Sequence, residues 1–273
     1  MSGRRIVLCA DDYGISPAVS AAIRNLIARR RINATSVMVV APSFTRAEAD
    51  ALLAAAATHA AIGLHVTLTA PFAPLSHGFA PLGRGAFLSL AATMRRAHLR
   101  SLQPELLTIE ILRQFEAFDT AFGRPPDFVD GHQHVHLFPQ IRDAFLRVTK
   151  EAAPKAWVRQ CGRLAARRRF SDHKALLLDG LSRRFRSLAG KSGLRTNPAF
   201  AGTYMFRSSA DYTRLFEDFV DGMPDGGVIM CHPGKVDAEL SRVDTLTDLR
   251  EREYAFFSSD TFPRLLAAHG VSL

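Results

Sequence analysis

Cysteines are scarce in this sequence, and they lie too far apart to form a cysteine-based scaffold. Cys9, Cys161 and Cys231 are the only three, which excludes a disulfide framework and a thiolate zinc site. Long hydrophobic runs are also missing, since no stretch approaches the roughly 18 apolar residues of a transmembrane helix. The N-terminal MSGRRIVLCADDYG lacks the apolar core of a signal peptide. We therefore expect a cytoplasmic protein with no membrane span.

Ordinary proportions of apolar and charged residues indicate a folded globular protein. The 273 residues are 47% hydrophobic and 22% charged, which excludes intrinsic disorder, collagen and coiled coils. Internal repeats and low-complexity segments are absent from the sequence. Because single α/β barrels of about 250 residues are common, we expect one domain over residues 1–273.

The net charge of +9 comes from one segment of the chain. Residues 159–195 contain eleven basic and two acidic side chains, so the rest of the chain carries 24 of each sign. Such an insertion-like segment could contact an anionic or lipid-linked glycan, form a dimer contact or be a solvated helical face. The segment matches no aromatic-interleaved basic motif of a nucleic-acid-binding protein, and we therefore do not expect nucleic acid as a partner.

Apolar patterning predicts alternating strands and helices. The alternation favours an α/β fold with a (β/α) barrel-like sheet, of which an irregular or incomplete TIM-type barrel is one form. The strands are expected at 6–10, 35–40, 61–68, 127–136, 157–159 and 226–231, and the helices at 17–27, 44–58, 88–102, 104–122, 140–151, 246–254 and 262–269.

Chemically active side chains collect at four predicted strand ends. Asp11 and Asp12 follow the first strand, His65 lies in the third, DGHQHVH occupies 130–136 and His232 follows the last. In a parallel α/β architecture these ends meet on one rim. Carboxylates and neutral imidazoles together suit zinc or another divalent metal.

The adjacent carboxylates Asp11 and Asp12 are expected to have different roles. In an extended segment neighbouring side chains point to opposite sides, so one cannot duplicate the other. A metal ligand and a general base are the natural division. The alternative is that they cap the following helix, but Ser16 before Pro17 fits that position better.

The histidine run offers candidate ligands as well. His132, His134 and His136 alternate, so in an extended strand all three face one side, where a metal could take one or two of them. For His136 a hydrogen-bonded core histidine is an equal alternative. Asp130 either orients an imidazole or is a turn residue before Gly131.

His65 and His232 are functional candidates only because of the other clusters. Each alone could be a buried histidine whose ring nitrogens are hydrogen-bonded within the core. His232 follows a buried strand and precedes Pro233, which aims its side chain over the sheet edge. A protonated imidazole there could act as general acid. The neighbouring Cys231 is interpreted as an inert small hydrophobe.

Five segments of the sequence together resemble the YdjC-like carbohydrate deacetylase family. They are DDYGISPAV at 11–19, GLHVTLT at 63–69, VDGHQHVHLFP at 129–139, TNPAFAGTY at 196–204 and CHPG at 231–234. The resemblance implies a barrel-like fold, often a homodimer. It also implies removal of the acetyl group from N-acetylated amino sugars such as chitooligosaccharides with a divalent metal, Mg²⁺ or Zn²⁺.

The resemblance also suggests roles for individual residues. By position, Asp12, His65 and His132 match the family's metal ligands, Asp11 matches the base and His232 the acid. Residues further out that could orient these groups or contact substrate are Asp130, His134, His136, Phe200 and Tyr204. The loop at 70–86 is a further candidate for the sugar platform. Lys235 stands where many relatives have an aromatic residue, which argues against sugar stacking at that position.

Two other functions fit parts of the pattern. A metal-dependent phosphoesterase or deaminase on the same fold is one, because an HxH pattern does not select the scissile bond. A nucleic-acid-binding protein that uses residues 159–195 is the other. The released product separates the first from a deacetylase, and charge reversal in the basic segment tests the second.

Overall fold

Seven parallel strands form one curved sheet in the computed structural model, which describes residues 3–164, 173–204 and 211–273. Their spatial order is β6-β5-β4-β3-β2-β8-β7. The bounds are β2 Val7–Tyr13, β3 Ala34–Val37, β4 Ala61–Val66, β5 Phe128–Gly131, β6 Trp157–Val158, β7 Phe200–Ala201 and β8 Val228–Cys231, and a separate parallel pair joins β1 (Arg4–Arg5) to β9 (Val271–Ser272). The predicted α/β barrel-like fold is confirmed.

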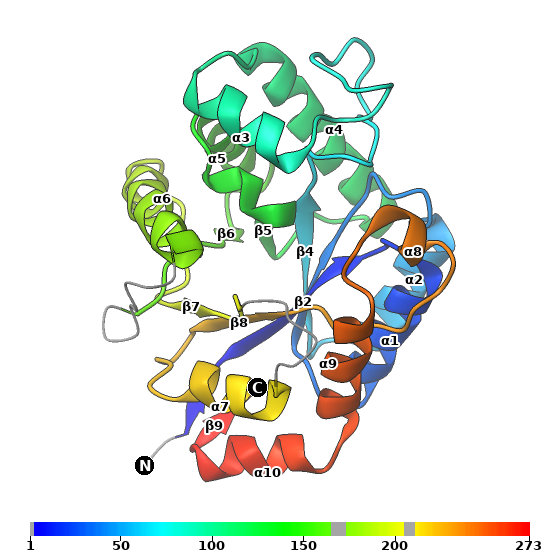
Figure 1. Ribbon diagram of the computed structural model, residues 1–273, viewed down its shortest axis with the longest axis vertical. Coiled ribbons are helices and arrows are strands. Elements are labelled where there is room, and N and C mark those ends of the chain that lie inside the picture. The colour runs from blue at the N-terminus through cyan, green and yellow to red at the C-terminus, as the bar shows by residue number, and fades with distance from the viewer. Residues whose placement is uncertain (1–2, 165–172, 205–210) are drawn as a thin grey trace.

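Helices cover the outside of this sheet, as Figure 1 shows. They are α1 Pro17–Ala28, α2 Arg46–Ala56, α3 Leu90–His98, α4 Pro104–Phe122, α5 Ile141–Ala152, α6 His173–Lys191, α7 Tyr212–Val220, α8 Leu240–Val243, α9 Asp248–Ser258 and α10 Thr261–Ala268. The predicted start of α1 is confirmed, because the Ser16 side chain accepts a hydrogen bond from the Val19 amide at 3.3 Å. Among the described residues, no helix is long and apolar enough to cross a membrane.

The strands bury apolar side chains throughout their length, as expected for a parallel sheet covered by helices. Leu8, Val37, Leu64 and Val129 are fully buried and come from four neighbouring strands. Their packing holds the strand backbones in fixed register, so the polar residues at the carboxyl ends are carried to defined positions on the same rim.

An asparagine side chain helps to close the sheet where β6 and β7 do not pair. The Val158 amide donates to Arg195 O at 2.9 Å, which starts a parallel bridge between Val158 and Thr196. Beyond it, the Asn197 side chain accepts from the Gln160 amide at 2.8 Å and donates to Gln160 O at 3.0 Å. These are the backbone groups that another strand would have paired.

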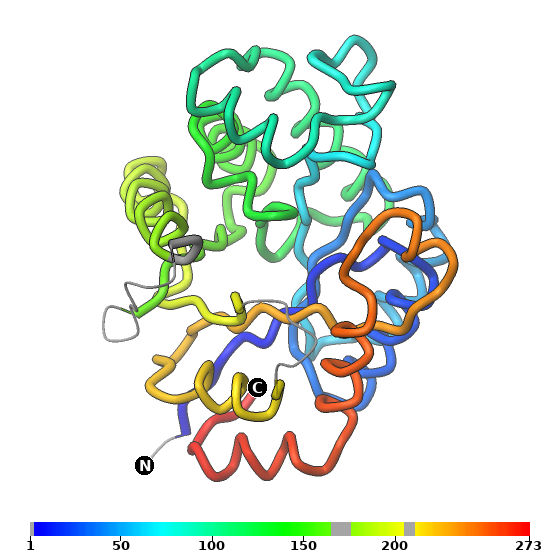
Figure 2. The backbone as a smooth tube through the Cα atoms, viewed as in Figure 1, coloured from blue at the N-terminus to red at the C-terminus, as the bar shows by residue number. Residues whose placement is uncertain are grey.

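One part of the sequence-based prediction is wrong in local structure. Residues 132–136, predicted as the end of a strand, belong instead to the 3₁₀ segment η1 His132–Leu137, which is kinked where Gln133 and His134 adopt positive φ. The basic segment, for which a solvated helical face was one expectation, contains α6, which lies beside η1 and α5 (Figure 2). Residues 165–172 of that segment lie outside the described residues.

Candidate active site

A pocket of about 520 Å³ opens at the carboxyl ends of the strands. Its lining includes Asp11, Asp12, His65, His132 and His232, so residues that are up to 221 positions apart meet there. The segment 244–249, which leads from α8 into the first turn of α9, forms another part of its wall. The predicted convergence of strand ends is therefore what the structure shows.

The backbone of β2 is irregular where its two aspartates lie. Pairing with β3 shifts register between Ala10 and Tyr13, and Asp12 has a φ of 67°. The left-handed region is disfavoured for most residues but tolerated by aspartate. Sites that carry such strain are often functional, and here the irregularity coincides with two neighbouring carboxylates that contact different partners.

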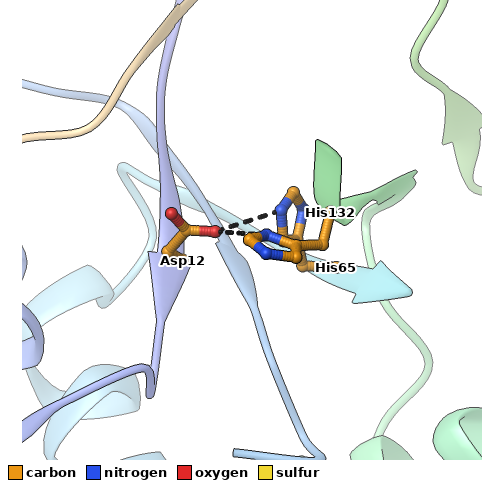
Figure 3. A group of neighbouring side chains, drawn as sticks. All are labelled: Asp12, His65 and His132. Atoms are coloured by element: carbon orange, nitrogen blue, oxygen red, sulfur yellow. Dashed lines mark hydrogen bonds and ion pairs between the residues drawn. The ribbon is translucent and has the colours of Figure 1, made fainter. Parts of the chain in front are cut away.

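Asp12, His65 and His132 form a compact donor group (Figure 3). Asp12 Oδ1 lies 3.0 Å from His132 Nδ1 and 3.3 Å from His65 Nε2. All three side chains are buried, and one ligand atom from each falls within 4.8 Å of the others. One carboxylate oxygen and two imidazole nitrogens match what a divalent first-row cation binds.

Asp130 orients the His65 ring from behind. Its Oδ1 lies 2.5 Å from His65 Nδ1, so we assign the Nδ1 proton to that contact, and Nε2 faces Asp12. Burial lowers the pKa of His65, but the charge of Asp130 and the neighbouring carboxylates raise it to about 10. A cation held by the three residues would take the place of the Nε2 proton. The carboxylate-imidazole pair is a common support for metal-binding histidines.

Asp11 lies on the other side of the strand end, in an ion pair with Arg159. Arg159 Nη1 lies 2.6 Å from Asp11 Oδ2, and Nη2 lies 2.7 Å from Oδ1. Ser36 Oγ adds a hydrogen bond to Oδ1 at 3.2 Å. Burial raises the pKa of the Asp11 carboxyl, but the charges of Arg159, His65 and His232 and the hydrogen bonds from Arg159 together outweigh burial and hold the pKa below its usual value. Asp11 is therefore ionised and firmly oriented.

Arg159 also excludes a cation from a second group of donor atoms. Cys9, Asp11 and Asp130 place ligand atoms within 4.8 Å of one another. Arg159 Nη2 already lies 2.9 Å from Cys9 Sγ and 2.5 Å from Asp130 Oδ2. A guanidinium thus fills the position that a metal would occupy there, and only the Asp12 group remains open to one among the described residues.

Asp12 has its own arginine partner. Arg250 Nη2 on α9 donates to Asp12 Oδ2 at 2.6 Å, on the oxygen that does not face the histidines. Burial raises the pKa of Asp12, whereas Arg250 and His132 lower it, and the net result is a pKa well below the usual range. Asp12 is therefore present as the carboxylate that a metal ligand requires.

His232 follows β8 and reaches the pocket beside Asp11 and Asp12. Its backbone amide donates to Glu253 Oε2 at 2.5 Å, and the other oxygen of Glu253 accepts from Tyr204 Oη at 2.8 Å. Burial raises the pKa of Glu253, and His232 and its amide act in the opposite direction. Glu253 thus fixes the backbone of His232 at the end of β8.

The three histidines of the run do not share one face, which corrects the sequence-based prediction. Only His132 reaches Asp12. His134 is half-buried, and its Nδ1 lies 3.4 Å from Cys161 Sγ. His136 is fully buried, with Nε2 2.8 Å from Arg159 O. The positive φ values at positions 133 and 134 turn the chain, so the alternation of an extended strand does not apply.

Gly131 makes room for the buried His136 ring. A Cβ atom at position 131 would lie 2.8 Å from His136 Nδ1, closer than side chains tolerate. Burial lowers the pKa of His136 to about 4, so the ring is neutral and Nε2 donates to Arg159 O. His136 thus supports the backbone that carries Arg159.

The two aromatic candidates for a sugar platform are buried. Phe200 meets the His134 ring edge-on, with 5.8 Å between centroids, and Tyr204 bonds to Glu253. Neither belongs to the described pocket lining. In the loop at 70–86, Phe72 contacts the His132 ring edge-on at 6.0 Å. Lys235 Nζ lies 5.4 Å from the centroid of Tyr254.

Sequence reasoning missed three buried charged residues of the site. Arg159 follows the short strand β6, so the strand-end rule that identified Asp11 could also have found it, but it was counted with the basic segment. Arg250 and Glu253 lie within α9, where no strand end marks them. Only the packing of α9 against the rim reveals their contacts.

Comparison with known families and proteins identifies similar sequences over most of the chain. The family model described as YdjC-like protein matches residues 5–268. A chitooligosaccharide deacetylase of Serratia marcescens is 30% identical over 236 residues, covering 78% of this chain and 88% of the relative. A chitooligosaccharide deacetylase of Escherichia fergusonii is 28% identical, covering 86% and 83% respectively.

Solved structures agree on the fold. A crystal structure of a protein from Enterococcus faecalis V583, named for cellobiose-phosphate cleavage, superimposes with a TM-score of 0.75 at 22% identity and covers 100% of this chain and 97% of its own. A lactam utilization protein from Thermus thermophilus gives a TM-score of 0.56 at 15% identity, covering 98% of both chains. At these identities the likeness concerns the barrel-like architecture alone.

Proposed function

We propose that this chain, which belongs to the YdjC-like family, is a carbohydrate deacetylase that removes the N-acetyl group from acetylated amino sugars of the chitooligosaccharide type. The observation that carries the proposal is the pocket in which a metal-type donor group, an ionised aspartate and a histidine lie together. The names of the two bacterial relatives supply the substrate class.

Asp12, His65 and His132 would hold the divalent cation, Zn²⁺ or Mg²⁺. The mixed nitrogen and oxygen donors favour Zn²⁺ over Mg²⁺, which prefers oxygen ligands. When bound, such a cation polarises the amide carbonyl of the substrate and makes nearby water more acidic. Asp130 keeps Nε2 of His65 directed at the cation position.

Asp11 would act as general base toward the attacking water. Among the described residues, its Oδ2 accepts hydrogen bonds only from Arg159 and so retains accepting capacity. The bidentate ion pair holds the carboxylate in place at the pocket lining, which removes the cost of orienting it during the reaction. Arg159 remains protonated throughout and serves to position Asp11.

His232 would donate a proton to the nitrogen of the breaking amide bond. Glu253 accepts a hydrogen bond from the backbone amide of His232, which fixes the position of this residue at the pocket lining. Water then supplies a hydroxyl to the acetyl carbon, the C–N bond breaks, and the products are a free amino sugar and acetic acid, which loses its proton to solvent as acetate. Atoms and charge balance because Asp11 gains one proton and His232 loses one.

The test is acetate release from diacetylchitobiose by metal-reconstituted protein, with and without a chelator. We expect acetate in amounts equal to the free amine formed, and loss of both after chelation. Release of phosphate from a sugar phosphate, or of ammonia from a nucleobase, without any acetate from diacetylchitobiose would reject the proposal in favour of another hydrolase chemistry at this site.

A further inference from the structure

One side chain joins the candidate metal ligand to a wall of the pocket. Arg250 Nη2 donates to Asp12 Oδ2 and also to Asp244 Oδ2, both at 2.6 Å. Its Nε donates to the backbone oxygen of Leu246 at 3.0 Å. Asp12 is the penultimate residue of β2, whereas the other two residues belong to the segment 244–249 that lines the pocket.

Arg250 is well suited to hold several partners at once. A guanidinium is planar and carries five donors in a fixed fork, whereas a lysine ammonium is a flexible point charge. The side chain of Arg250 is only 1% exposed, and its backbone oxygen accepts from the Gly234 amide at 3.0 Å. The guanidinium is therefore a fixed reference point between the strand end and the loop.

As a result, the two oxygens of Asp12 contact different partners. Oδ2 is taken by Arg250, while Oδ1 faces the imidazoles of His65 and His132. Without the arginine, the buried carboxylate would be free to rotate about its side-chain bonds, and the oxygen presented to a cation would no longer be defined. Asp244 lies outside the donor group, so its contact concerns the loop alone.

We propose that Arg250 is a positioning residue that couples two events: it orients Asp12 for the cation, and it holds the 244–249 wall of the pocket where the sugar binds. This inference rests on the proposed deacetylase function for its sugar-binding half. It predicts that the two halves can be separated by substitution, because Asp12 and Asp244 are contacted by the same nitrogen from different parts of the chain.

The experiment compares Arg250→Lys, which keeps the charge but loses the fork, with Asp244→Ala. The second variant removes the Asp244 contacts with Arg250 and with the Leu246 amide, and leaves the ion pair between Arg250 and Asp12 in place. Zn²⁺ is titrated into metal-stripped protein by calorimetry, KM and kcat are measured with diacetylchitobiose, and hydrogen exchange is followed in residues 244–249. Arg250→Lys should bind Zn²⁺ about 10-fold or more weakly and raise KM. Asp244→Ala should keep Zn²⁺ affinity within about twofold, yet raise KM and speed exchange in the loop.

Arg242→Gln is the control, because Arg242 is exposed on the neighbouring α8 and lies outside the described pocket lining. It should match the wild type in all three measurements. Wild-type Zn²⁺ affinity in Arg250→Lys would overturn the proposal, and so would wild-type KM and loop exchange in Asp244→Ala. If Arg250→Lys does not fold, Asp244→Ala still tests the proposal, because its KM must rise while its Zn²⁺ affinity stays within about twofold of the wild type.

The proposed function and this inference can fail separately. Should the wild-type protein release no acetate, the deacetylase proposal fails, but Zn²⁺ affinity and loop exchange still report on Arg250. Should acetate be released while Arg250→Lys retains wild-type Zn²⁺ binding, the function stands and the coupling through Arg250 is wrong.

Discussion

Asp11 and Asp12 are neighbours in sequence, yet each belongs to a different region of the rim. Arg159, which follows β6, donates hydrogen bonds to both oxygens of Asp11 in a buried ion pair. Arg250, on α9, takes one oxygen of Asp12 and leaves the other toward two imidazoles. We call Asp11 with Arg159 the Asp11 side of the site. The Asp12 side consists of Asp12, Arg250, His65 and His132.

The contrast in arginine geometry explains how equivalent carboxylates acquire different chemistry. A two-point contact fixes a carboxylate and keeps it ionised, which suits a base that must be ready in one orientation. A one-point contact keeps an oxygen available, which suits a metal ligand. Substitutions on the Asp12 side should therefore affect cation binding, whereas substitutions on the Asp11 side should affect turnover and stability with the cation retained.

The largest effect is expected from His132→Ala on the Asp12 side. The change deletes one of three donor groups, so Zn²⁺ affinity should fall by at least about 100-fold and acetate release should be lost with it. Inductively coupled plasma mass spectrometry gives the metal content, and circular dichroism verifies the fold. Full metal stoichiometry in a folded variant would show that His132 is not a ligand.

Asp11→Asn tests the other side of the comparison. An amide cannot accept the proton from water at neutral pH, so kcat should fall by about 10²- to 10⁴-fold, while Zn²⁺ affinity stays near that of the wild type. Steady-state kinetics and Zn²⁺ titration are both needed. A variant that loses the metal together with activity would abolish the distinction between Asp11 and Asp12. Ser36→Ala, which removes one hydrogen bond to Asp11 and a 3.1 Å contact with His65 Nδ1 but keeps the carboxylate, should cost far less.

Arg159→Met should mainly reduce stability. It leaves the buried carboxylates of Asp11 and Asp130 without their shared cation, and breaking one partner of a buried ion pair costs about 3–5 kcal/mol. Urea denaturation at pH 7 measures the free energy of unfolding. Arg46→Met, which removes an exposed pair with Asp50, is the control and should change it by less than about 1 kcal/mol. Equal decreases in the free energy of unfolding of the two variants would contradict a stabilising role for the buried ion pair of Arg159.

The smallest effect is expected in the pH dependence of stability from His136, which supports Arg159. Its pKa is lowered to about 4 in the folded state from an unfolded value near 6.5. The unfolded chain therefore binds more protons between these values, and stability from this group, present above pH 6.5, is lost as pH falls toward 4. The full loss is about 3 kcal/mol, because one unit of pKa difference corresponds to about 1.4 kcal/mol.

His136→Gln keeps a donor for Arg159 O but does not titrate. We expect the free energy of unfolding to fall less steeply in this variant than in the wild type between pH 6.5 and pH 4.5, measured by urea denaturation at each pH. Parallel curves for the two proteins would mean that His136 takes up its proton as readily in the folded state as in the unfolded chain. The kinetic and metal-binding properties at pH 7 should change little, since the Asp12 side is untouched.

Much of the fold and part of the site were predictable from sequence. Strand ends at Asp11 and Asp12, at His65 and at His232 were placed correctly on one rim, because apolar runs that stop at polar residues mark the carboxyl ends of buried strands. The helix α4, at Pro104–Phe122, matched its predicted bounds, since proline begins it and an apolar face runs along it.

The histidine run shows where such reasoning fails. Strict alternation predicted one common face for His132, His134 and His136, but positive φ at Gln133 and His134 kinks the chain within the 3₁₀ segment η1. Alternation in a sequence does not reveal which residues adopt a left-handed backbone conformation, and neither Gln133 nor His134 is a glycine or an asparagine that would suggest one. The partners in α9 were equally hidden, because a buried arginine in a helix has the same local pattern as an exposed one.

The order of strands and helices, the strand-end carboxylates and imidazoles, and the resemblance to a deacetylase family all follow from the amino-acid sequence, because each depends on local patterns. Which arginine meets which aspartate follows from the folded chain alone. Arg159 is 148 positions from Asp11, and Arg250 is 238 positions from Asp12. Contacts over such separations depend on how β6 and α9 are placed around the sheet, and that placement is a property of the packed core as a whole.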